Sequence, residues 1–386
     1  MDGKSHHTKK SLTPQQNLLA AFGHRKTDWV PWIPYIGGVN TPVFIPPEIK
    51  KRQDPVEIGL FMQDYLGCDI LIDGNPLKAG GKTGVSSRTT RRGDTVIAEV
   101  SIAGRILRTV HRTFSYGDQE TSAISDYPVK TVEDLQTLEL LVQENGSDAE
   151  PGGSDFEDKS KRLGERGLVY CVGPRTPLMS LVIEYMSLEV FIEMLMEMPE
   201  RLEILMSRMH QNNLRYYRAA AKSSARIIAT FDDFTTSLIT PDMFKKYILP
   251  CLKEYSDILH QAGKYHMVHS CGHIRGFLPM CLDAGYDAHN YLAQPPVGDT
   301  PLSEAHRIWG DNISIMAAVD PVMLERGDSC QVERHVGDML AELASSQSMM
   351  LMTSSKPAVK EENLRAVARG LAKSSITLKT QKARIN

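Results

Sequence analysis

The sequence predicts an α/β fold, a (β/α)8 TIM barrel, from the alternation of its segments and their number. Short runs rich in valine, isoleucine and aromatic residues alternate with longer segments of helical periodicity, which is typical of parallel strands joined by helices. Eight such runs occur, the number that closes a TIM barrel. Most are apolar without alternation, as expected for strands buried on both faces. We therefore expect strands at residues 30–35, 69–73, 168–173, 226–233, 265–271, 288–294, 313–320 and 349–353.

Two helical segments carry clear boundary signals. Thr240 followed by Pro241 predicts a helix start, because threonine caps helices and proline suits their first turn. Pro250 predicts a kink in the same helix. The segment 177–222 is long enough for two helices, which we expect to meet near Pro199.

Two segments interrupt the barrel pattern. Residues 95–114 alternate in polarity around Ala103-Gly104, which predicts a β-hairpin excursion after the second strand. Residues 144–161 are mostly Glu, Asp, Ser and Gly, which predicts a mobile acidic insertion. We expect disordered tails at 1–11 and 379–386, which leaves a single domain over 12–378. A dinucleotide-binding enzyme of two domains would need a glycine-rich turn of defined spacing, and the glycine clusters lack it.

The composition excludes several classes of protein. The 386 residues are 41% hydrophobic and 24% charged, unlike a disordered or low-complexity chain. The net charge of −3 gives no bulk attraction for nucleic acid or anionic lipid. There is neither a membrane-span-length apolar stretch nor an apolar signal core, and the six cysteines are scattered, as in proteins with reduced thiols. We therefore expect a cytoplasmic protein without membrane or nucleic-acid partners.

Polar side chains collect at the carboxyl ends of the expected strands, the face on which TIM barrels carry their active sites. Each could contact a substrate or form a turn, and Pro321 after Asp320 favours the turn there. The candidate substrate-binding residues are Tyr35, Asp73, Arg175, Asn290 and Asp320.

The most informative pair is His269 and Cys271, two positions apart on the fifth expected strand. Residues with this spacing point to the same side of a strand, so both could face the barrel mouth. An imidazole and a thiol are ligands that suit zinc. The alternative is a hydrogen-bonded interior histidine next to a small core cysteine.

Asp232 and Asp233 end the fourth expected strand and are the candidate catalytic residues. Because adjacent side chains point in opposite directions, only one can face the pocket, while the other braces the loop. The carboxylate in the pocket could bind a cationic substrate, act as a general base or complete a metal site.

Around His269 and Cys271 the chain resembles the uroporphyrinogen decarboxylase superfamily, and more closely its methylcobamide-dependent methyltransferase branch. The resemblance implies a TIM barrel, in agreement with the strand count. In the thiol-methylating branch it implies zinc held by a His-x-Cys pair, here His269 and Cys271, and by a distant cysteine. The resemblance also rests on residues 28–31, 127–135, 232–234, 240–250, 285–287, 318–321 and 362–364.

The chain departs from the family pattern at two places. Decarboxylases of the family carry an arginine-bearing segment near the N-terminus, but residues 30–38 contain no arginine to bind the carboxylates of a porphyrinogen. The position of the distant cysteine falls at residues 353–355, Thr-Ser-Ser. A third ligand would then come from Asp233, Glu184 or another group, or the site holds no metal.

Three functions follow as hypotheses. The first is a zinc-assisted methyltransferase, with a small-molecule substrate and a corrinoid protein or another methyl carrier as partner. The second is a decarboxylase of a carboxylated small molecule or porphyrinogen-like substrate, with Arg175 or Arg275 as carboxylate anchor. The third is a barrel without catalysis that binds a small molecule or a protein.

Overall fold

Eight parallel strands form the barrel of this computed structural model, and each overlaps one of the eight expected runs. The structure describes residues 11–385 except 37–40, 79–83, 117–118, 145–148, 344–347, 355 and 357, with the backbone alone at 116, 119 and 374–385. The strands follow one another in the order β1-β14-β13-β12-β11-β10-β9-β2. They are β1 (Trp32–Pro34), β2 (Ile70–Asp73), β9 (Gly167–Gly173), β10 (Ile227–Phe231), β11 (Tyr265–His269), β12 (Ala288–Leu292), β13 (Ser314–Ala318) and β14 (Met349–Thr353).

Asp69 joins β1 and β2, the first and last strands of this order. Its N–H donates to the carbonyl oxygen of Trp32 at 2.7 Å. Its carboxylate accepts from N of Trp32 at 3.0 Å and from Nε1 of Trp29 at 3.2 Å. These bonds bring the two ends of the sheet together, so the predicted TIM barrel is confirmed.

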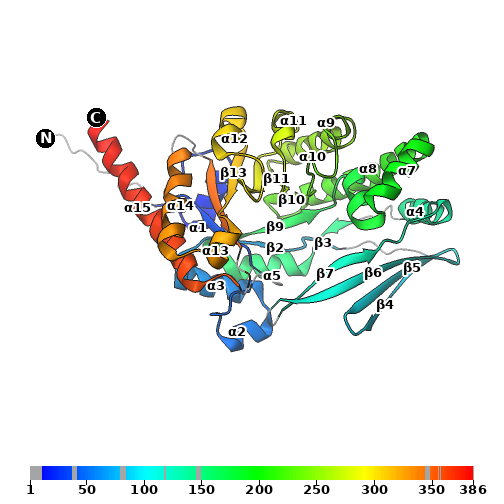
Figure 1. The fold of residues 1–386 in the computed structure, drawn as a ribbon, viewed down its shortest axis with the longest axis horizontal. Coiled ribbons are helices and arrows are strands. Elements are labelled where there is room, and N and C mark those ends of the chain that lie inside the picture. Colours follow the sequence, from blue (N-terminus) through cyan, green and yellow to red (C-terminus); the bar gives the residue numbers. More distant parts are fainter. Residues whose placement is uncertain are drawn as a thin grey trace.

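Helices surround the barrel (Figure 1). Thr240 accepts a hydrogen bond from N of Met243 at 3.2 Å, which confirms the predicted helix start. A π-helical turn at Phe244–Ile248 precedes Pro250, where the kink was expected, and two helices meet at Pro199 as predicted. The helices are α1 (Pro14–Phe22), α2 (Pro47–Arg52), α3 (Pro55–Leu66), α4 (Val132–Glu144), α5 (Ser154–Leu163), α6 (Pro177–Ser180), α7 (Leu188–Glu197), α8 (Pro199–Lys222), α9 (Pro241–Met243), α10 (Leu249–Gln261), α11 (Leu278–Asp283), α12 (Leu302–Trp309), α13 (Pro321–Arg326), α14 (Ser329–Glu342) and α15 (Glu361–Ile385).

A four-stranded antiparallel sheet projects from the barrel after β2, on the side away from α14 and α15 (Figure 1). It consists of β4 (Val85–Arg92), β5 (Thr95–Ile102), β6 (Arg105–Tyr116) and β7 (Gln119–Asp126). The hairpin predicted around Ala103-Gly104 joins β5 and β6, and both turn residues have positive φ, 49° and 75°. The other two strands are additional to the prediction, because β4 is almost entirely Ser, Thr and Arg and lacks apolar alternation.

The composition of the acidic segment 144–161 predicts a mobile insertion, but part of this segment has regular structure. Its residues 145–148 lie outside the described residues. Beyond them, β8 (Glu150–Pro151) pairs with β3 (Leu77–Lys78), and α5 follows. Phe156 and Leu163, seven residues apart, are buried on one face of α5 and tie it to the core. At the other expected tail, α15 continues to Ile385, whereas residues 1–10 are not described.

Two apolar cores hold the molecule together, one inside the barrel and one between the strands and the helices. Successive side chains of a strand alternate between them. Met267 therefore lies in the inner core and Val268 in the outer one, and His269 again faces inward above Met267. This parity positions the polar residues at the barrel mouth.

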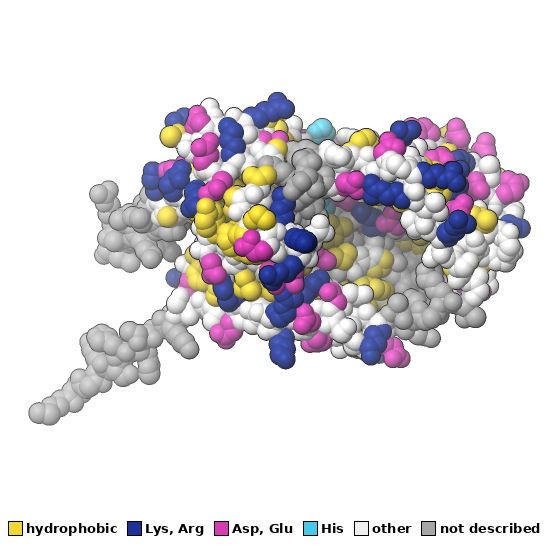
Figure 2. All heavy atoms as spheres, turned by 90° about the horizontal axis from the view of Figure 1, so that it is seen from below, with side chains coloured by type: hydrophobic (Ala, Val, Ile, Leu, Met, Phe, Trp, Pro, Cys, Tyr) yellow, Lys and Arg dark blue, Asp and Glu magenta, His cyan; other side chains and the backbone are white. Residues whose placement is uncertain are grey.

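Basic and acidic side chains are interspersed over the face seen in Figure 2. Among the described residues, no helix is both long and apolar enough to span a membrane. All six cysteines are free thiols, as their scatter predicts.

Candidate functional site

Three side chains with metal-ligating atoms meet at the carboxyl ends of β10 and β11, which are neighbours in the sheet. They belong to Asp233, His269 and Cys271, and their donor atoms all lie within 4.8 Å of one another. Oδ1 of Asp233 lies 3.2 Å from Nε2 of His269 and 3.9 Å from Sγ of Cys271. In the part of the chain that the structure describes, this is the one such group of His, Cys, Asp and Glu. The pair predicted from strand parity is thus joined by a carboxylate.

The backbone is strained on both sides of this cluster. The N–H groups of Asp232 and Asp233 both donate to the carbonyl oxygen of His269, each at 3.1 Å. Asp233 has a φ of 54°, in the left-handed region that residues with a side chain rarely adopt. Tyr291, whose ring lies beside His269, has a φ of 68° at a bulge in β12. Such strain is concentrated at functional sites, which supports a role for this cluster.

Asp232 lies outside the cluster although it precedes Asp233. Its side chain is fully buried, and its carboxylate oxygens accept hydrogen bonds from N and Oγ1 of Thr176 at 2.7 and 2.8 Å. Burial raises its pKa to about 7. The carboxylate of Asp232 braces the segment after β9, and its catalytic role stays a prediction. Of the two aspartates, Asp233 alone belongs to the cluster.

Replacing Thr176 by valine is expected to destabilise the fold by about 2 kcal/mol, because the buried carboxylate of Asp232 loses a hydroxyl donor. Urea unfolding measures this change. Thr121→Val, on the exposed face of β7, is the control and should change stability by less than about 0.5 kcal/mol. Equal unfolding midpoints for the two variants would contradict the bracing role.

Arg175 holds Asp233 in place. Its Nη1 lies 2.7 Å from Oδ2 of Asp233 and also donates to the carbonyl oxygen of Phe231, while its Nε lies 3.0 Å from Oε1 of Glu184. Nδ2 of Asn213 holds the carbonyl oxygen of Arg175 at 2.7 Å. Arg175 is thus engaged within the protein, where it holds Asp233, and its role in substrate binding stays a prediction. Glu184, a candidate third ligand, contacts Arg175 and lies outside the cluster.

His269 is held at both ring nitrogens and on one face of its ring. Its Nδ1 lies 2.7 Å from Oδ1 of Asn290, and the ring of Phe231 stacks on it at 4.9 Å between centroids. Burial alone would lower the pKa of His269, but hydrogen bonds to the Asp233 carboxylate and to Cys271 outweigh burial and raise the pKa to about 10. The same negative groups that favour a proton on this imidazole would favour a metal cation.

The donor set and its spacing fit a zinc ion. With Zn–N and Zn–O distances of about 2.0 Å and a Zn–S distance of about 2.3 Å, the ligand atoms of a tetrahedral site lie about 3.3–3.5 Å apart. The observed 3.2 Å and 3.9 Å are close to these values. The contact of Asn290 with Nδ1 leaves Nε2 for a metal, which is the usual arrangement around a ligating histidine. Asp233, His269 and Cys271 would supply three ligands.

Three of the predicted substrate-binding residues line one small cavity at the barrel mouth. Tyr35, Asp73 and Asn290 surround it together with Tyr170, and its volume is about 30 Å³. The rest of the lining is apolar and comes from β1, β2, β14 and Ile36, which follows β1. Asn290 belongs to both places, since it lines the cavity and contacts His269.

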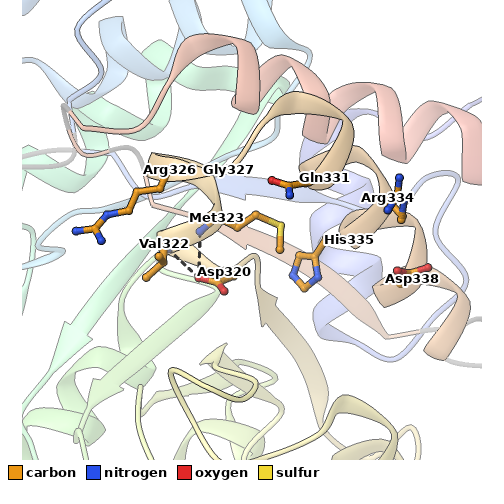
Figure 3. A pocket seen from close by; sticks show the side chains of 9 residues that line it. All are labelled: Asp320, Val322, Met323, Arg326, Gly327, Gln331, Arg334, His335 and Asp338. Atoms are coloured by element: carbon orange, nitrogen blue, oxygen red, sulfur yellow. Dashed lines mark hydrogen bonds between the residues drawn. The ribbon is translucent and has the colours of Figure 1, made fainter.

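Asp320 does not line the cavity at the barrel mouth and lies at the start of α13. Its Oδ1 accepts hydrogen bonds from the N–H groups of Val322 and Met323, at 2.7 and 3.3 Å, and so caps α13. It lines an open depression between α13 and α14, in which its carboxylate turns back to the helix start (Figure 3). The turn that Pro321 favours is confirmed, and Asp320 is removed from the candidate substrate contacts at the mouth.

Sequence reasoning missed three aromatic residues around the site. Tyr170 and Phe231 lie on β9 and β10, and Tyr291 follows Asn290 on β12. Strand parity could have found Tyr170, because Leu168 two positions earlier also faces the barrel interior. The position of Tyr291 depends on the bulge in β12, for which the sequence carries no signal.

Comparisons with known proteins agree with this architecture. A curated uroporphyrinogen decarboxylase from Carboxydothermus hydrogenoformans is 23% identical over 210 residues, which are 53% of this chain and 57% of that protein, less than two thirds of its length. A methyltransferase from Methanosarcina mazei superposes with a TM-score of 0.60 at 14% identity, over 94% of this chain and 99% of that one. The model of the uroporphyrinogen decarboxylase (URO-D) family matches residues 94–370. This chain, with its barrel and its cluster at the mouth, belongs to the uroporphyrinogen decarboxylase family.

Proposed function

We propose that this protein transfers a methyl group at the barrel mouth, between a methyl carrier and a thiol acceptor, with zinc held by Asp233, His269 and Cys271. The convergence of these three donors carries the proposal. A corrinoid bound to a partner protein is the carrier that we propose. The fold itself can serve methyl transfer, since the superposed protein from Methanosarcina mazei is a methyltransferase.

The protein's own residues hold the ligands in position. Arg175 neutralises one oxygen of Asp233 and turns the other toward His269 and Cys271. Oδ1 of Asn290 accepts a hydrogen bond from Nδ1 of His269, which leaves Nε2 directed toward the cluster. The stacked ring of Phe231 excludes water from one face of the imidazole.

The transfer needs a thiolate as nucleophile. Zinc, when bound, supplies a Lewis acid that favours the thiolate form of the acceptor. The sulfur–methyl bond forms as the bond between the methyl group and its carrier breaks, and the carrier keeps the electron pair. The thiol proton passes to solvent through the exposed side of the cluster, at which Cys271 is exposed and Asp233 partly exposed.

The arginines argue against a decarboxylase. A carboxylated substrate needs a free cationic anchor, for which Arg175 and Arg275 are the sequence candidates. Arg175 is bound to Asp233 and Glu184, and Nε of Arg275 lies 2.8 Å from Oε2 of Glu304. Both guanidinium groups therefore already have carboxylate partners.

Metal analysis combined with a transfer assay tests the proposed function. Purified protein is expected to contain one zinc ion per chain, and to demethylate methylcobalamin in the presence of a thiol, followed by its visible spectrum. Removal of zinc with a chelator should abolish the reaction, and added zinc should restore it. A protein that binds no metal, or whose transfer is unchanged by the chelator, would contradict the proposal. Release of carbon dioxide from carboxylated substrates would favour the lyase.

A further inference from the structure

The cavity at the barrel mouth lies beside the metal-ligating cluster and is lined by other side chains, apart from Asn290, which contacts His269. Its polar lining comes from Tyr35, Asp73, Tyr170 and Asn290. Side chains two positions earlier on the strands, Ile33, Leu71 and Leu168, lie in the inner core, so the first three polar residues face the barrel interior as well. The cavity therefore opens above the inner core, where a substrate next to the cluster would extend.

The charge of the cavity is negative. Asp73 is the one charged side chain among the described residues that line it. Nζ of Lys159 donates to the backbone carbonyl oxygen of Asp73 at 3.0 Å and pairs with Asp155 at 3.1 Å. Arg175 is balanced by Asp233 and Glu184. Among the described residues of the lining, a carboxylate placed here would meet another carboxylate and no cation.

The two tyrosines suit a cation. Their hydroxyls are hydrogen-bonded to each other. Burial, followed by the charge of Asp73, raises the pKa of Tyr35, and burial, followed by Tyr35 and then Asp73, raises the pKa of Tyr170, so both phenols are neutral. Aromatic rings attract ammonium groups through their electron-rich faces, and this attraction grows where water is excluded. Tyr170 is buried and Tyr35 half-buried.

The size of the cavity limits what can enter. A volume of about 30 Å³ admits roughly two water-sized groups, since each needs about 10–15 Å³. A small ammonium head group, such as one with a single methyl or methylene substituent, suits this size.

We propose that this cavity, lined by Tyr35, Asp73 and Tyr170, binds a small ammonium head group of the substrate whose reacting atom lies at the metal-ligating cluster. The assignment to a substrate rests on the proposed function, but the binding of the head group does not require methyl transfer.

Titrations with [13C]methylammonium, observed by NMR on the zinc-loaded protein, test the proposal. [13C]Methanol and [13C]formate are the neutral and anionic probes of similar size. Methylammonium is expected to bind at least tenfold more tightly than methanol, and formate should not bind. Asp73→Asn should weaken methylammonium binding at least tenfold, while Asp283→Asn, at an exposed position of α11, should leave it unchanged. Thermal unfolding of Asp73→Asn should match the parent protein.

The outcomes separate this inference from the proposed function. Preferred binding of formate, equal binding of methanol and methylammonium, an unchanged affinity in Asp73→Asn, or no binding of any probe would each overturn the head-group site. Cys271→Ser should leave methylammonium binding intact, because Cys271 is not part of the cavity lining. If methylammonium binds but zinc-dependent methyl transfer fails, the proposed function falls and the head-group site stands. If zinc-dependent methyl transfer succeeds but methylammonium does not bind, the head-group site alone is overturned.

Discussion

Cys271→Ser is expected to lower the affinity for zinc about 100-fold or more, and to abolish methyl transfer. Serine keeps the size of the side chain, but its hydroxyl stays protonated at neutral pH and is a poor zinc ligand. The change removes the one sulfur of the cluster and leaves Asp233 and His269 as ligands. Competition with a chromophoric chelator measures the affinity.

Cys330→Ser is the matched control for this variant. Cys330 is also an exposed free thiol, but it lies on α14 outside the cluster. Its replacement should change neither zinc affinity nor transfer. If both variants bind zinc as tightly as the parent protein, Cys271 is not a ligand and the three-residue site is wrong.

The contribution of two buried histidines to the stability of the protein is expected to fall by about 4 kcal/mol between pH 7 and pH 5. Burial lowers the pKa of His266 and of His289 to about 3, from 6.5 as the reference for the unfolded chain. Between these two values the unfolded chain binds more protons than the folded one. The stability that His266 and His289 contribute is therefore present above pH 6.5 and is lost as the pH falls toward 3.

His266→Asn tests this pH dependence. His266 is fully buried, with Ser256 and Thr230 each 2.8 Å from a ring nitrogen. The variant should be less stable at pH 7, but its stability should fall by about 2 kcal/mol less between pH 7 and pH 5 than that of the parent. Urea unfolding at several pH values measures both quantities. His111→Asn, on the projecting sheet, is the control and should keep the parent's pH dependence of stability. If stability changes equally between pH 7 and pH 5 in the parent, His266→Asn and His111→Asn, this role of His266 is contradicted.

The barrel was predictable because its strands are continuous apolar runs, a local property of the sequence. The inward direction of His269 followed from strand parity, which also operates locally. Cys271 lies beyond the last residue of β11, so parity alone could not place it. Its proximity to Asp233 depends on the left-handed backbone at that residue.

The roles of Arg175 and Asn290 were not predictable, because their partners come from other strands and helices. Arg175 was a candidate substrate anchor, but its guanidinium is held by Glu184, nine residues later, and by Asp233. Asn290 was a candidate substrate contact, and its amide also accepts a hydrogen bond from His269 and lies above the sulfur atoms of two inner-core methionines. Such long-range pairings leave no periodic signal in a single sequence.

X-ray absorption at the zinc edge of the purified protein tests the central claim most directly. The account predicts one sulfur neighbour at about 2.3 Å and nitrogen or oxygen neighbours at about 2.0 Å, with the sulfur absent in Cys271→Ser. A zinc ion surrounded by nitrogen and oxygen alone in the parent protein, or a sulfur neighbour that persists in Cys271→Ser, would contradict it.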